Sequence, residues 1–261
     1  SISAAALGSR VVMVVRNTSR GDNAKAEICR EVPDAEIDVQ RCDVSDLADV
    51  RSFAELAREE YPRIDAVIHN AGVLPASRAE SAQGHELSLA THVLGPVLLT
   101  ELILPSLRSA PNPQVVFMSS GGMYAQQLPA SDLEYRTGAY RGATAYARSK
   151  RVQVALTPLL AQKWPGVGVS SMHPGWVDTP GLADALPGFR TAVRPLLRTP
   201  AQAADTAVWL IATAPPPQSG QFWHDREPRT PHYLSRTKYT DEQLGRVWTE
   251  CAEAISVPPG G

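Results

Sequence analysis

The regular alternation of strand-like and helix-like segments constrains the fold of this chain more than any other feature. Short apolar runs rich in β-branched residues, such as residues 11–15, are typical of strands buried on both faces. Segments with apolar residues at helical spacing, such as residues 46–60, separate these runs. Strands that alternate with crossover helices predict an α/β fold with a mostly parallel sheet covered on both faces.

The predicted elements fill most of the chain. The predicted strands are residues 11–15, 37–42, 64–69, 114–118, 167–172 and 221–224. The predicted helices are residues 22–31, 46–60, 83–107, 143–164 and 201–212. A last helix over residues 240–256 begins with a capping box, Thr240-Asp241-Glu242-Gln243, and carries one apolar stripe. That stripe predicts that the helix packs against the body of the domain.

Length, charge and cysteine content exclude several classes of protein. A chain of 261 residues with a net charge of −2 suits one α/β domain and has no field that favours nucleic acid or anionic membranes. Pro96, Glu101 and Pro105 interrupt the longest apolar stretch, so we expect no membrane span. Three scattered cysteines and a start without signal-peptide features predict a cytoplasmic protein with no metal site.

Polar or glycine-bearing segments follow the first five predicted strands. They are Arg16, Asp43, Asn70-Ala71-Gly72, Ser119-Ser120-Gly121 and His173-Pro174-Gly175. Because parallel sheets bind ligands at the carboxyl ends of their strands, these segments mark the predicted site.

Tyr146 and Lys150 lie four residues apart in a predicted helix and therefore share one helix face. A tyrosine ordinarily titrates at about 10, and a nearby cation favours the phenolate. We therefore expect Lys150 to lower the pKa of Tyr146, which would let the phenol act as a general acid or base. Ser120, at the end of a strand, can donate to a carbonyl oxygen that gains charge, although a lone serine there more often caps a turn.

These segments together resemble the short-chain dehydrogenase/reductase family over residues 10–223. The motifs are Asn70-Ala71-Gly72, Ser119-Ser120, Tyr146-x-x-x-Lys150 and Pro174-Gly175-x-Val177-x-Thr179, in this order. Residues 119–123, 146–157 and 171–181 look most like its retinol-dehydrogenase-like branch. The resemblance implies one doubly wound Rossmann-type domain over residues 1–261, with residues 180–200 as a substrate lid, assembled as a homodimer or homotetramer.

The resemblance also implies a role for each motif residue. Tyr146 would exchange a proton with the substrate oxygen, Lys150 would hold the nicotinamide ribose hydroxyls, and Ser120 would orient the carbonyl. Further implied cofactor contacts are Asp43 and Val44 at the adenine, Asn70, Ala71 and Gly72 on the adenosine side, and Pro174, Gly175, Val177 and Thr179 at the carboxamide.

Arg16 bears on the choice of cofactor. An acidic residue at the end of this strand would bind the ribose hydroxyls of NAD, whereas an arginine can pair with a 2′-phosphate. No carboxylate follows Arg16 before Asp22. The sequence therefore favours NADP over NAD, against the alternative of a solvated arginine that needs no ligand.

One departure from the family pattern is His92, which stands where the family has an asparagine thought to hold a water that relays protons to the lysine. An imidazole also binds water, but it titrates at about 6.5. Three outcomes are open: a working relay with altered pH dependence, a slower enzyme, or a lost activity. A buried histidine in a helix is also commonly a satisfied core residue.

The second departure is larger. No segment matches the family's Thr-Gly-x-x-x-Gly-x-Gly turn, whose backbone amides cradle the pyrophosphate. Residues 11–15 correspond to the family's second strand, and its first strand lies in the middle of the sheet. We expect that strand and turn to precede Ser1 in a natural chain at least ~30 residues longer, with residues 1–7 ending the following helix.

The leading hypothesis is an NADP-dependent oxidoreductase that interconverts a carbonyl and an alcohol. Apolar side chains in residues 180–200 favour a lipophilic substrate, with Trp176 as a candidate wall of its pocket. His92 and the missing turn motivate a non-catalytic dinucleotide-binding sensor or scaffold. A nucleotide-sugar epimerase or dehydratase also shares Tyr-x-x-x-Lys, but the resemblance around residues 173–181 disfavours it.

Overall fold

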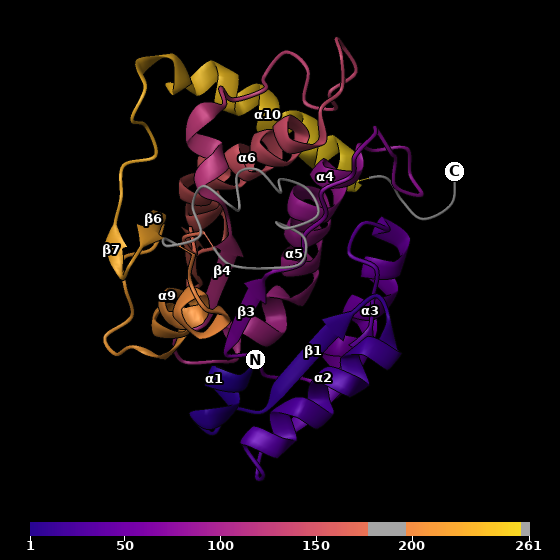
Figure 1. Cartoon of the computed structure of the whole chain (residues 1–261), viewed down its shortest axis with the longest axis vertical. Helices are drawn as coiled ribbons and strands as arrows, with labels where there is room; N and C mark the ends of the chain where they lie inside the picture. Colours follow the sequence, from indigo (N-terminus) through magenta and orange to yellow (C-terminus); the bar gives the residue numbers. More distant parts are fainter. Residues whose placement is uncertain (177–196, 257–261) are drawn as a thin grey trace.

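Parallel strands flanked by helices form the body of the protein in the computed structural model, which describes residues 1–176 and 197–256 (Figure 1). The strands are β1 (Val11–Val15), β2 (Ile37–Arg41), β3 (Ala66–His69), β4 (Gln114–Met118), β5 (Gly168–Met172), β6 (Gln221–His224) and β7 (Glu227–Pro228). The helices are α1 (Ile2–Ala6), α2 (Thr18–Glu31), α3 (Leu47–Glu60), α4 (Leu87–Leu89), α5 (Gly95–Arg108), α6 (Gly142–Lys163), α9 (Pro200–Ala212) and α10 (Asp241–Ser256). The predicted α/β alternation is confirmed.

The strands form two hydrogen-bonded sets. β1 and β2 pair in parallel, while β3, β4, β5 and β6 form a second parallel set that β7 extends in the antiparallel sense. Among the described strands, no ladder joins β1 to β3. Every residue of β1 is accordingly half-buried, whereas the first four residues of the interior strand β4 are buried. Within the part of the chain that the structure describes, β1 and β3 therefore each have a ladder on one side only.

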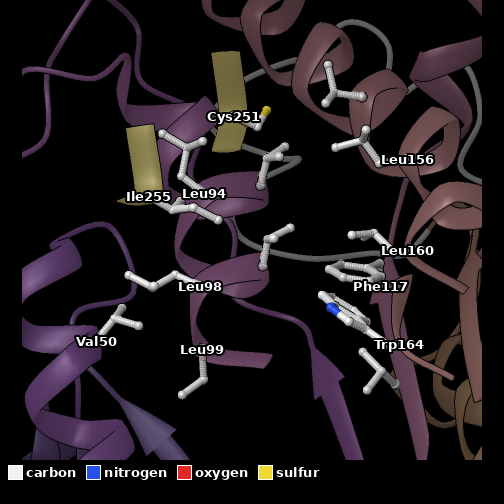
Figure 2. Close-up of a cluster of buried hydrophobic side chains, with 14 of the residues drawn as sticks. Val50, Leu94, Leu98, Leu99, Phe117, Leu156, Leu160, Trp164, Cys251 and Ile255 are labelled. Carbon is white, nitrogen blue, oxygen red and sulfur yellow. The ribbon is translucent and has the colours of Figure 1, made fainter. Parts of the chain in front are cut away.

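The largest hydrophobic core lies between the strands and helices α3, α5, α6 and α10 (Figure 2). Its buried side chains include Val50, Leu94, Leu98, Leu99, Phe117, Leu156, Leu160, Trp164, Cys251 and Ile255.

The predicted capping box forms at the start of α10. The backbone N–H of Gln243 donates to Thr240 Oγ1 at 3.2 Å, and the backbone N–H of Thr240 donates to Gln243 Oε1 at 2.9 Å. Val247, Cys251 and Ile255 of the same helix are buried in the core. The apolar stripe of α10 therefore packs on the domain as predicted.

Two helical stretches begin four residues away from their predicted first residue, whereas the other predicted helices begin within one residue of it. α2 begins at Thr18 rather than residue 22, because the Asn17 side chain caps it by accepting the Arg20 N–H at 3.0 Å. The long helical stretch begins at Leu87 rather than residue 83, because the Glu86 carboxylate accepts the backbone N–H groups of the next turn. A π-helical turn, η1 (Ala90–Leu94), then links α4 to α5.

The prolines expected to break the apolar stretch do not interrupt this helix. By length and composition alone, the continuous segment Leu87–Arg108 is long and apolar enough to cross a membrane. However, 78% of its most apolar window is buried inside the protein, which is the environment of a core helix. The predicted helix through Pro96, Glu101 and Pro105 is therefore confirmed, whereas the expectation that these residues make the stretch too polar to pass as a span by composition was wrong.

Gly95 in α5 and Gly245 in α10 offer a matched test of packing. A Cβ on Gly95 would lie 1.8 Å from the carbonyl oxygen of Val44, whereas a Cβ on Gly245 would meet nothing within 4 Å. We expect Gly95→Ala to lower the free energy of unfolding by roughly 1–3 kcal/mol because overpacking forces the backbone to move. Gly245→Ala should raise it by roughly 0.5–1 kcal/mol, since alanine restricts the unfolded chain. Chemical denaturation checks both, and a stabilised Gly95→Ala variant would contradict the close approach.

Candidate active site

Ser120, Tyr146 and Lys150 meet where β4 ends beside α6. The Ser120 side chain lies close enough to Tyr146 to act on the pKa of its phenol, and Lys150 Nζ lies 5.5 Å from the centroid of the Tyr146 ring. Lys150 Nζ also donates to the Met118 carbonyl oxygen at 2.7 Å. Tyr146 is half-buried and Lys150 is only 2% exposed. The structure thus brings the three predicted catalytic side chains into one partly desolvated cluster.

Short hydrogen bonds fix α6 against the end of β4. Ser119 Oγ donates to the Lys150 carbonyl oxygen at 3.0 Å, and the Ser119 N–H donates to the Met172 carbonyl oxygen of β5 at 2.7 Å. Ser149 Oγ donates to the Tyr146 carbonyl oxygen at 2.8 Å. The bond from Ser119 to Lys150 therefore joins the helix of Tyr146 to the residue before Ser120.

Burial shifts the pKa values of Lys150 and Tyr146 in opposite directions. It lowers the pKa of Lys150 to about 7, because the charged ammonium loses its hydration. It also raises the pKa of Tyr146 above its usual value, and the opposite effect of the nearby Ser120 hydroxyl is smaller. The expectation that Lys150 would lower the pKa of Tyr146 is therefore wrong for this structure, since desolvation of the phenolate dominates.

His92 is completely buried beside Tyr146, with the two ring centroids 5.2 Å apart and perpendicular. The Val73 N–H can only donate, so His92 Nε2 must accept it at 3.0 Å, and the ring proton lies on Nδ1. Nδ1 lies 2.7 Å from Ser149 Oγ. Burial, with a smaller contribution from Lys150, holds the pKa of His92 well below its usual value. Both ring nitrogens of a neutral imidazole are therefore engaged.

The sequence analysis missed Gln153, which lies near His92. Pro96 has no N–H to donate to the residue four positions earlier, so the His92 carbonyl oxygen is free for another partner. Gln153 Nε2 donates to that oxygen at 2.6 Å. Gln153 follows Tyr146 by two helical turns on the same face, and this spacing together with Pro96 was the available signal.

The predicted adenosine contacts lie together at the ends of β1 and β2. The Cys42 N–H donates to the Val15 carbonyl oxygen at 3.0 Å, which sets Arg16 beside Asp43. Asp43 Oδ1 accepts from the backbone N–H and the hydroxyl of Ser45 at 3.0 and 2.7 Å, so this carboxylate holds its own turn. The Arg16 side chain is 68% exposed and lies 3.9 Å from Asp43 Oδ2. Its guanidinium therefore faces solvent at the predicted position.

The predicted loop residues of the cofactor site are only partly within the described chain. Asn70, Ala71 and Gly72 are exposed directly after β3, next to the ring of His92. Pro174 and Gly175 follow β5, and Gly175 has φ +81° with Arg198 packed against it. Val177, Thr179 and residues 180–196 of the predicted lid lie outside the described residues.

The described residues fit two ends of a nicotinamide dinucleotide. Lys150, Ser120 and Tyr146 lie at the end expected for the nicotinamide ribose, and Arg16 lies at the end expected for the adenosine. No segment of the sequence supplies the glycine-rich pyrophosphate cradle.

Comparisons with known proteins identify the family of this chain. A family model described as short chain dehydrogenase matches residues 1–187. Dehydrogenase/reductase SDR family member 12 of Bos taurus is 39% identical over 253 residues, which cover 94% of this chain and 79% of the relative. Retinol dehydrogenase 12 of Homo sapiens is 29% identical and covers 97% of this chain and 80% of the relative.

Solved structures show the same fold. A protein from Mycobacterium paratuberculosis superposes with a TM-score of 0.76 at 23% identity, covering 97% of this chain and 87% of that protein. A short chain dehydrogenase from Shigella flexneri, complexed with NADP, gives a TM-score of 0.67 at 23% identity, covering 85% and 88%. This chain therefore belongs to the short-chain dehydrogenase/reductase family of NAD(P)-dependent oxidoreductases, which act on small-molecule carbonyls and alcohols, within its retinol-dehydrogenase-like branch.

Proposed function

We propose that this protein is an NADP-dependent oxidoreductase that interconverts a lipophilic carbonyl and its alcohol, with Tyr146 as the acid/base group. The observation that carries the proposal is the placement of Ser120, Tyr146 and buried Lys150 together where β4 ends beside α6. The same geometry disfavours a non-catalytic sensor, because a sensor has no need of a desolvated acid.

The described side chains can perform the proton chemistry of reduction. The bound reduced nicotinamide would supply the hydride. The Tyr146 phenol donates its proton to the substrate oxygen, and its raised pKa keeps that proton in place until the reaction. Ser120 Oγ accepts the Gly122 N–H at 3.4 Å, so the serine hydroxyl hydrogen is not used by that contact and can turn from Tyr146 to the substrate oxygen when substrate binds. Lys150 in its charged form holds the ribose hydroxyls.

His92 acts in this proposal as a positioning residue. Its neutral ring connects Val73, after the Asn70-Ala71-Gly72 loop, to Ser149 on the helix of Tyr146. Because neither ring nitrogen is free, a proton relay through the imidazole is disfavoured. The ring instead fixes the cofactor loop relative to the catalytic helix.

Arg16 supports NADP as the cofactor, because its exposed guanidinium is available to pair with a 2′-phosphate. Solved structures of similar fold from Shigella flexneri and Escherichia coli are complexed with NADP and NADPH. A cytoplasmic location and a homodimer or homotetramer stay predictions from the sequence.

Two exposed apolar side chains support a lipophilic substrate. Leu74 is 38% exposed directly after the Asn70-Ala71-Gly72 loop, and Trp176 is 40% exposed directly after Gly175. The relatives named retinol dehydrogenase are consistent with such a substrate.

NADPH oxidation with a series of straight-chain aldehydes tests this proposal, alongside retinal, a steroid ketone and a quinone. Each CH₂ group that the protein buries contributes about 0.8 kcal/mol, so kcat/KM should rise about fourfold per added CH₂. A flat series would contradict the lipophilic substrate. NADPH binding without turnover of any compound would favour the sensor.

The pH dependence of kcat/KM reports groups of the free enzyme. Lys150 is charged below its pKa of about 7 and neutral above it, so kcat/KM for carbonyl reduction should fall as the pH rises through about 7. His92 stays neutral because its pKa is far lower. We therefore expect kcat/KM of His92→Asn to fall with rising pH as it does in the wild-type protein. If the fall is absent in that variant, the titrating group is His92 instead.

A further inference from the structure

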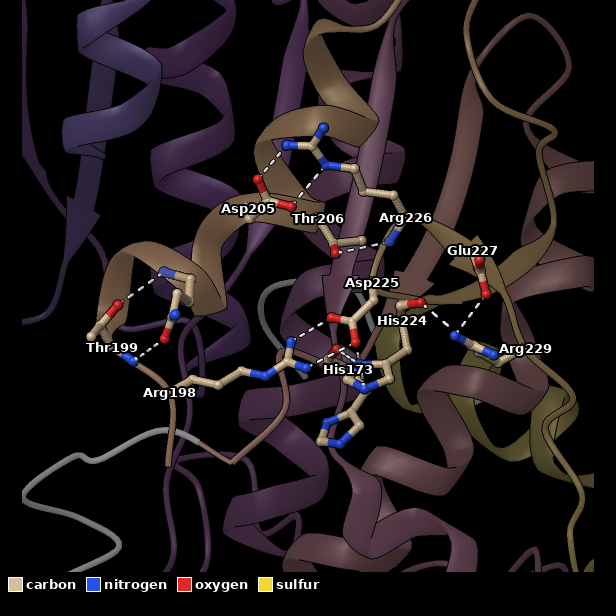
Figure 3. A network of polar contacts seen from close by, with 11 residues as sticks. His173, Arg198, Thr199, Asp205, Thr206, His224, Asp225, Arg226, Glu227 and Arg229 are labelled. Carbon is tan, nitrogen blue, oxygen red and sulfur yellow. Dashed lines mark hydrogen bonds and ion pairs between the residues drawn. The ribbon is translucent and has the colours of Figure 1, made fainter. Parts of the chain in front are cut away.

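Two stacked histidines lie beside the turn that carries Ser120. His173 follows β5 and His224 ends β6, and their ring centroids are 4.8 Å apart with an interplanar angle of 19° (Figure 3). Register explains the pairing, because β5 and β6 are hydrogen-bonded parallel neighbours and the His173 N–H donates to the Trp223 carbonyl oxygen at 2.9 Å. Neither imidazole takes part in the proposed proton chemistry.

The His173 ring accepts a hydrogen bond from the peptide that follows Ser120. The Gly121 N–H donates to His173 Nδ1 at 3.0 Å, so Nδ1 must be unprotonated. Ser120 caps the 3₁₀ turn η2 (Gly121–Ala125), and its Oγ accepts the Gly122 N–H. A Cβ on Gly121 would lie 2.8 Å from His173 Nε2, so a side chain there would collide with the ring. His173 therefore holds the first peptide of the turn that Ser120 caps.

Residues of the hairpin between β6 and β7 form a hydrogen-bonded network with the backbone of His173. His224 Nδ1 donates to the His173 carbonyl oxygen at 2.8 Å, and His224 Nε2 lies 3.4 Å from Asp225 Oδ2. Asp225 in turn accepts a bidentate hydrogen bond from the Arg198 guanidinium, with Nη2 to Oδ2 at 2.8 Å (Figure 3). Asp225 and Arg226 have φ of 54° and 57°, the left-handed conformation of a tight two-residue hairpin.

Arg198 also contacts the residues that follow His173 in the chain. Its N–H donates to the Trp176 carbonyl oxygen at 2.7 Å, and its side chain lies against Gly175. The imidazole of His173 is thus confined between the Ser120 turn and a fixed ion pair. Burial, with smaller contributions from His224 and Arg198, lowers the pKa of His173 to about 4, so Nδ1 stays an acceptor at neutral pH.

We propose that His173 is a positioning residue for carbonyl reduction: its Nδ1 fixes the Gly121 peptide and thereby aims the Ser120 hydroxyl at the substrate oxygen. This inference rests on the proposed function. Neighbouring residues after β5 then have different roles, because Pro174 and Gly175 would contact the cofactor while His173 acts on Ser120.

A pair of substitutions isolates the acceptor atom. His173→Asn keeps an acceptor oxygen at the place of Nδ1, whereas His173→Leu removes it and keeps an apolar side chain. Misplacing a group that orients the substrate costs up to about 100-fold, so we expect His173→Leu to lower kcat by about 10- to 100-fold with KM for NADPH unchanged. His173→Asn should restore most of kcat. Gly121→Ala should resemble His173→Leu, because the new methyl group displaces the ring.

Amide hydrogen exchange gives a second measurement that does not depend on turnover. The Gly121 amide should be protected in the wild-type protein and in His173→Asn, and exchange faster in His173→Leu. His85→Asn serves as the control, because the His85 ring pairs with Glu134 at 2.8 Å and has no contact with the Ser120 turn. Folding of each variant is checked by its thermal unfolding.

The outcomes distinguish this inference from the proposed function. Equal kcat in wild type and His173→Leu, or a loss in His173→Leu that His173→Asn does not restore, would overturn the positioning role. A wild-type protein that reduces no carbonyl would refute the proposed function. In that case, unchanged exchange at Gly121 in His173→Leu would show that the ring does not hold this peptide at all.

Discussion

Tyr146→Phe should lower kcat for NADPH-dependent carbonyl reduction by about 10²- to 10⁴-fold, the usual contribution of a positioned general acid. The phenyl ring keeps the perpendicular contact with His92, whose centroid lies 5.2 Å away, so the pocket should retain its shape. Only the phenol hydroxyl beside Ser120 is lost. The affinity for NADPH should therefore be unchanged. Stopped-flow NADPH oxidation gives the rate, and quenching of the protein's fluorescence gives the dissociation constant.

Tyr135→Phe is the matched control for this substitution. Tyr135 lies in an exposed part of the loop before α6, and its hydroxyl donates only to the Ala139 carbonyl oxygen at 3.1 Å. Its removal should leave kcat at the wild-type value. Turnover of Tyr146→Phe at the wild-type rate would refute the assignment of Tyr146 as the acid. Equal losses in both variants would indicate a general effect of removing a tyrosine hydroxyl.

The sequence predicts this fold well where a pattern depends on local chemistry. The β-branched run Val11–Val15 and the capping box at Thr240 are both present in the structure, because strand burial and helix capping are set within a few residues. The π-helical turn Ala90–Leu94 escaped prediction. It depends on Pro96 and on a partner for the freed carbonyl oxygen, and that partner, Gln153, is far away in the sequence.

The candidate site shows the same division between local and long-range information. Helical spacing alone placed Tyr146 and Lys150 on one face, and the structure has them there. The direction of the Tyr146 pKa shift could not be predicted, because it depends on how deeply the packed domain buries the phenol. The hydrogen-bond partners of His92 and His173 also could not be predicted from the sequence. Val73 and Gly121 donate through backbone N–H groups, which carry no sequence signature.

Lys150 and His92, the two buried basic side chains beside Tyr146, have different roles in the candidate site. Lys150 has spare N–H donors beyond its bond to Met118, so a ribose hydroxyl can bind without disrupting the fold. His92 has no spare ring nitrogen, so a ligand could engage it only by breaking a contact that holds the helix of Tyr146. The chemistry is therefore concentrated on Lys150, and His92 contributes rigidity.

Arg16→Asp should reverse the cofactor preference of the protein. A hydrogen bond to a charged group contributes about 1.5–3 kcal/mol, so loss of the pairing with the 2′-phosphate should lower kcat/KM for NADPH by about 10- to 150-fold. The new carboxylate would repel the phosphate, which adds to this loss, and would accept hydrogen bonds from the free ribose hydroxyls of NADH. Asp43, which lies 3.9 Å from the arginine, would not replace the lost cation because it carries the opposite charge.

Arg10→Gln provides the control at the opposite end of the same strand. Arg10 precedes β1 and already pairs with Asp38 at 2.7 Å, so it is not available to a cofactor phosphate. We expect its substitution to leave the ratio of kcat/KM for NADPH to that for NADH unchanged, while Arg16→Asp lowers the ratio below one. An unchanged ratio in Arg16→Asp would mean that the Arg16 guanidinium is only a solvated charge, and that NADP selection lies elsewhere. A similar fall in both variants would instead attribute the effect to the net positive charge near β1 rather than to a specific contact at its carboxyl end.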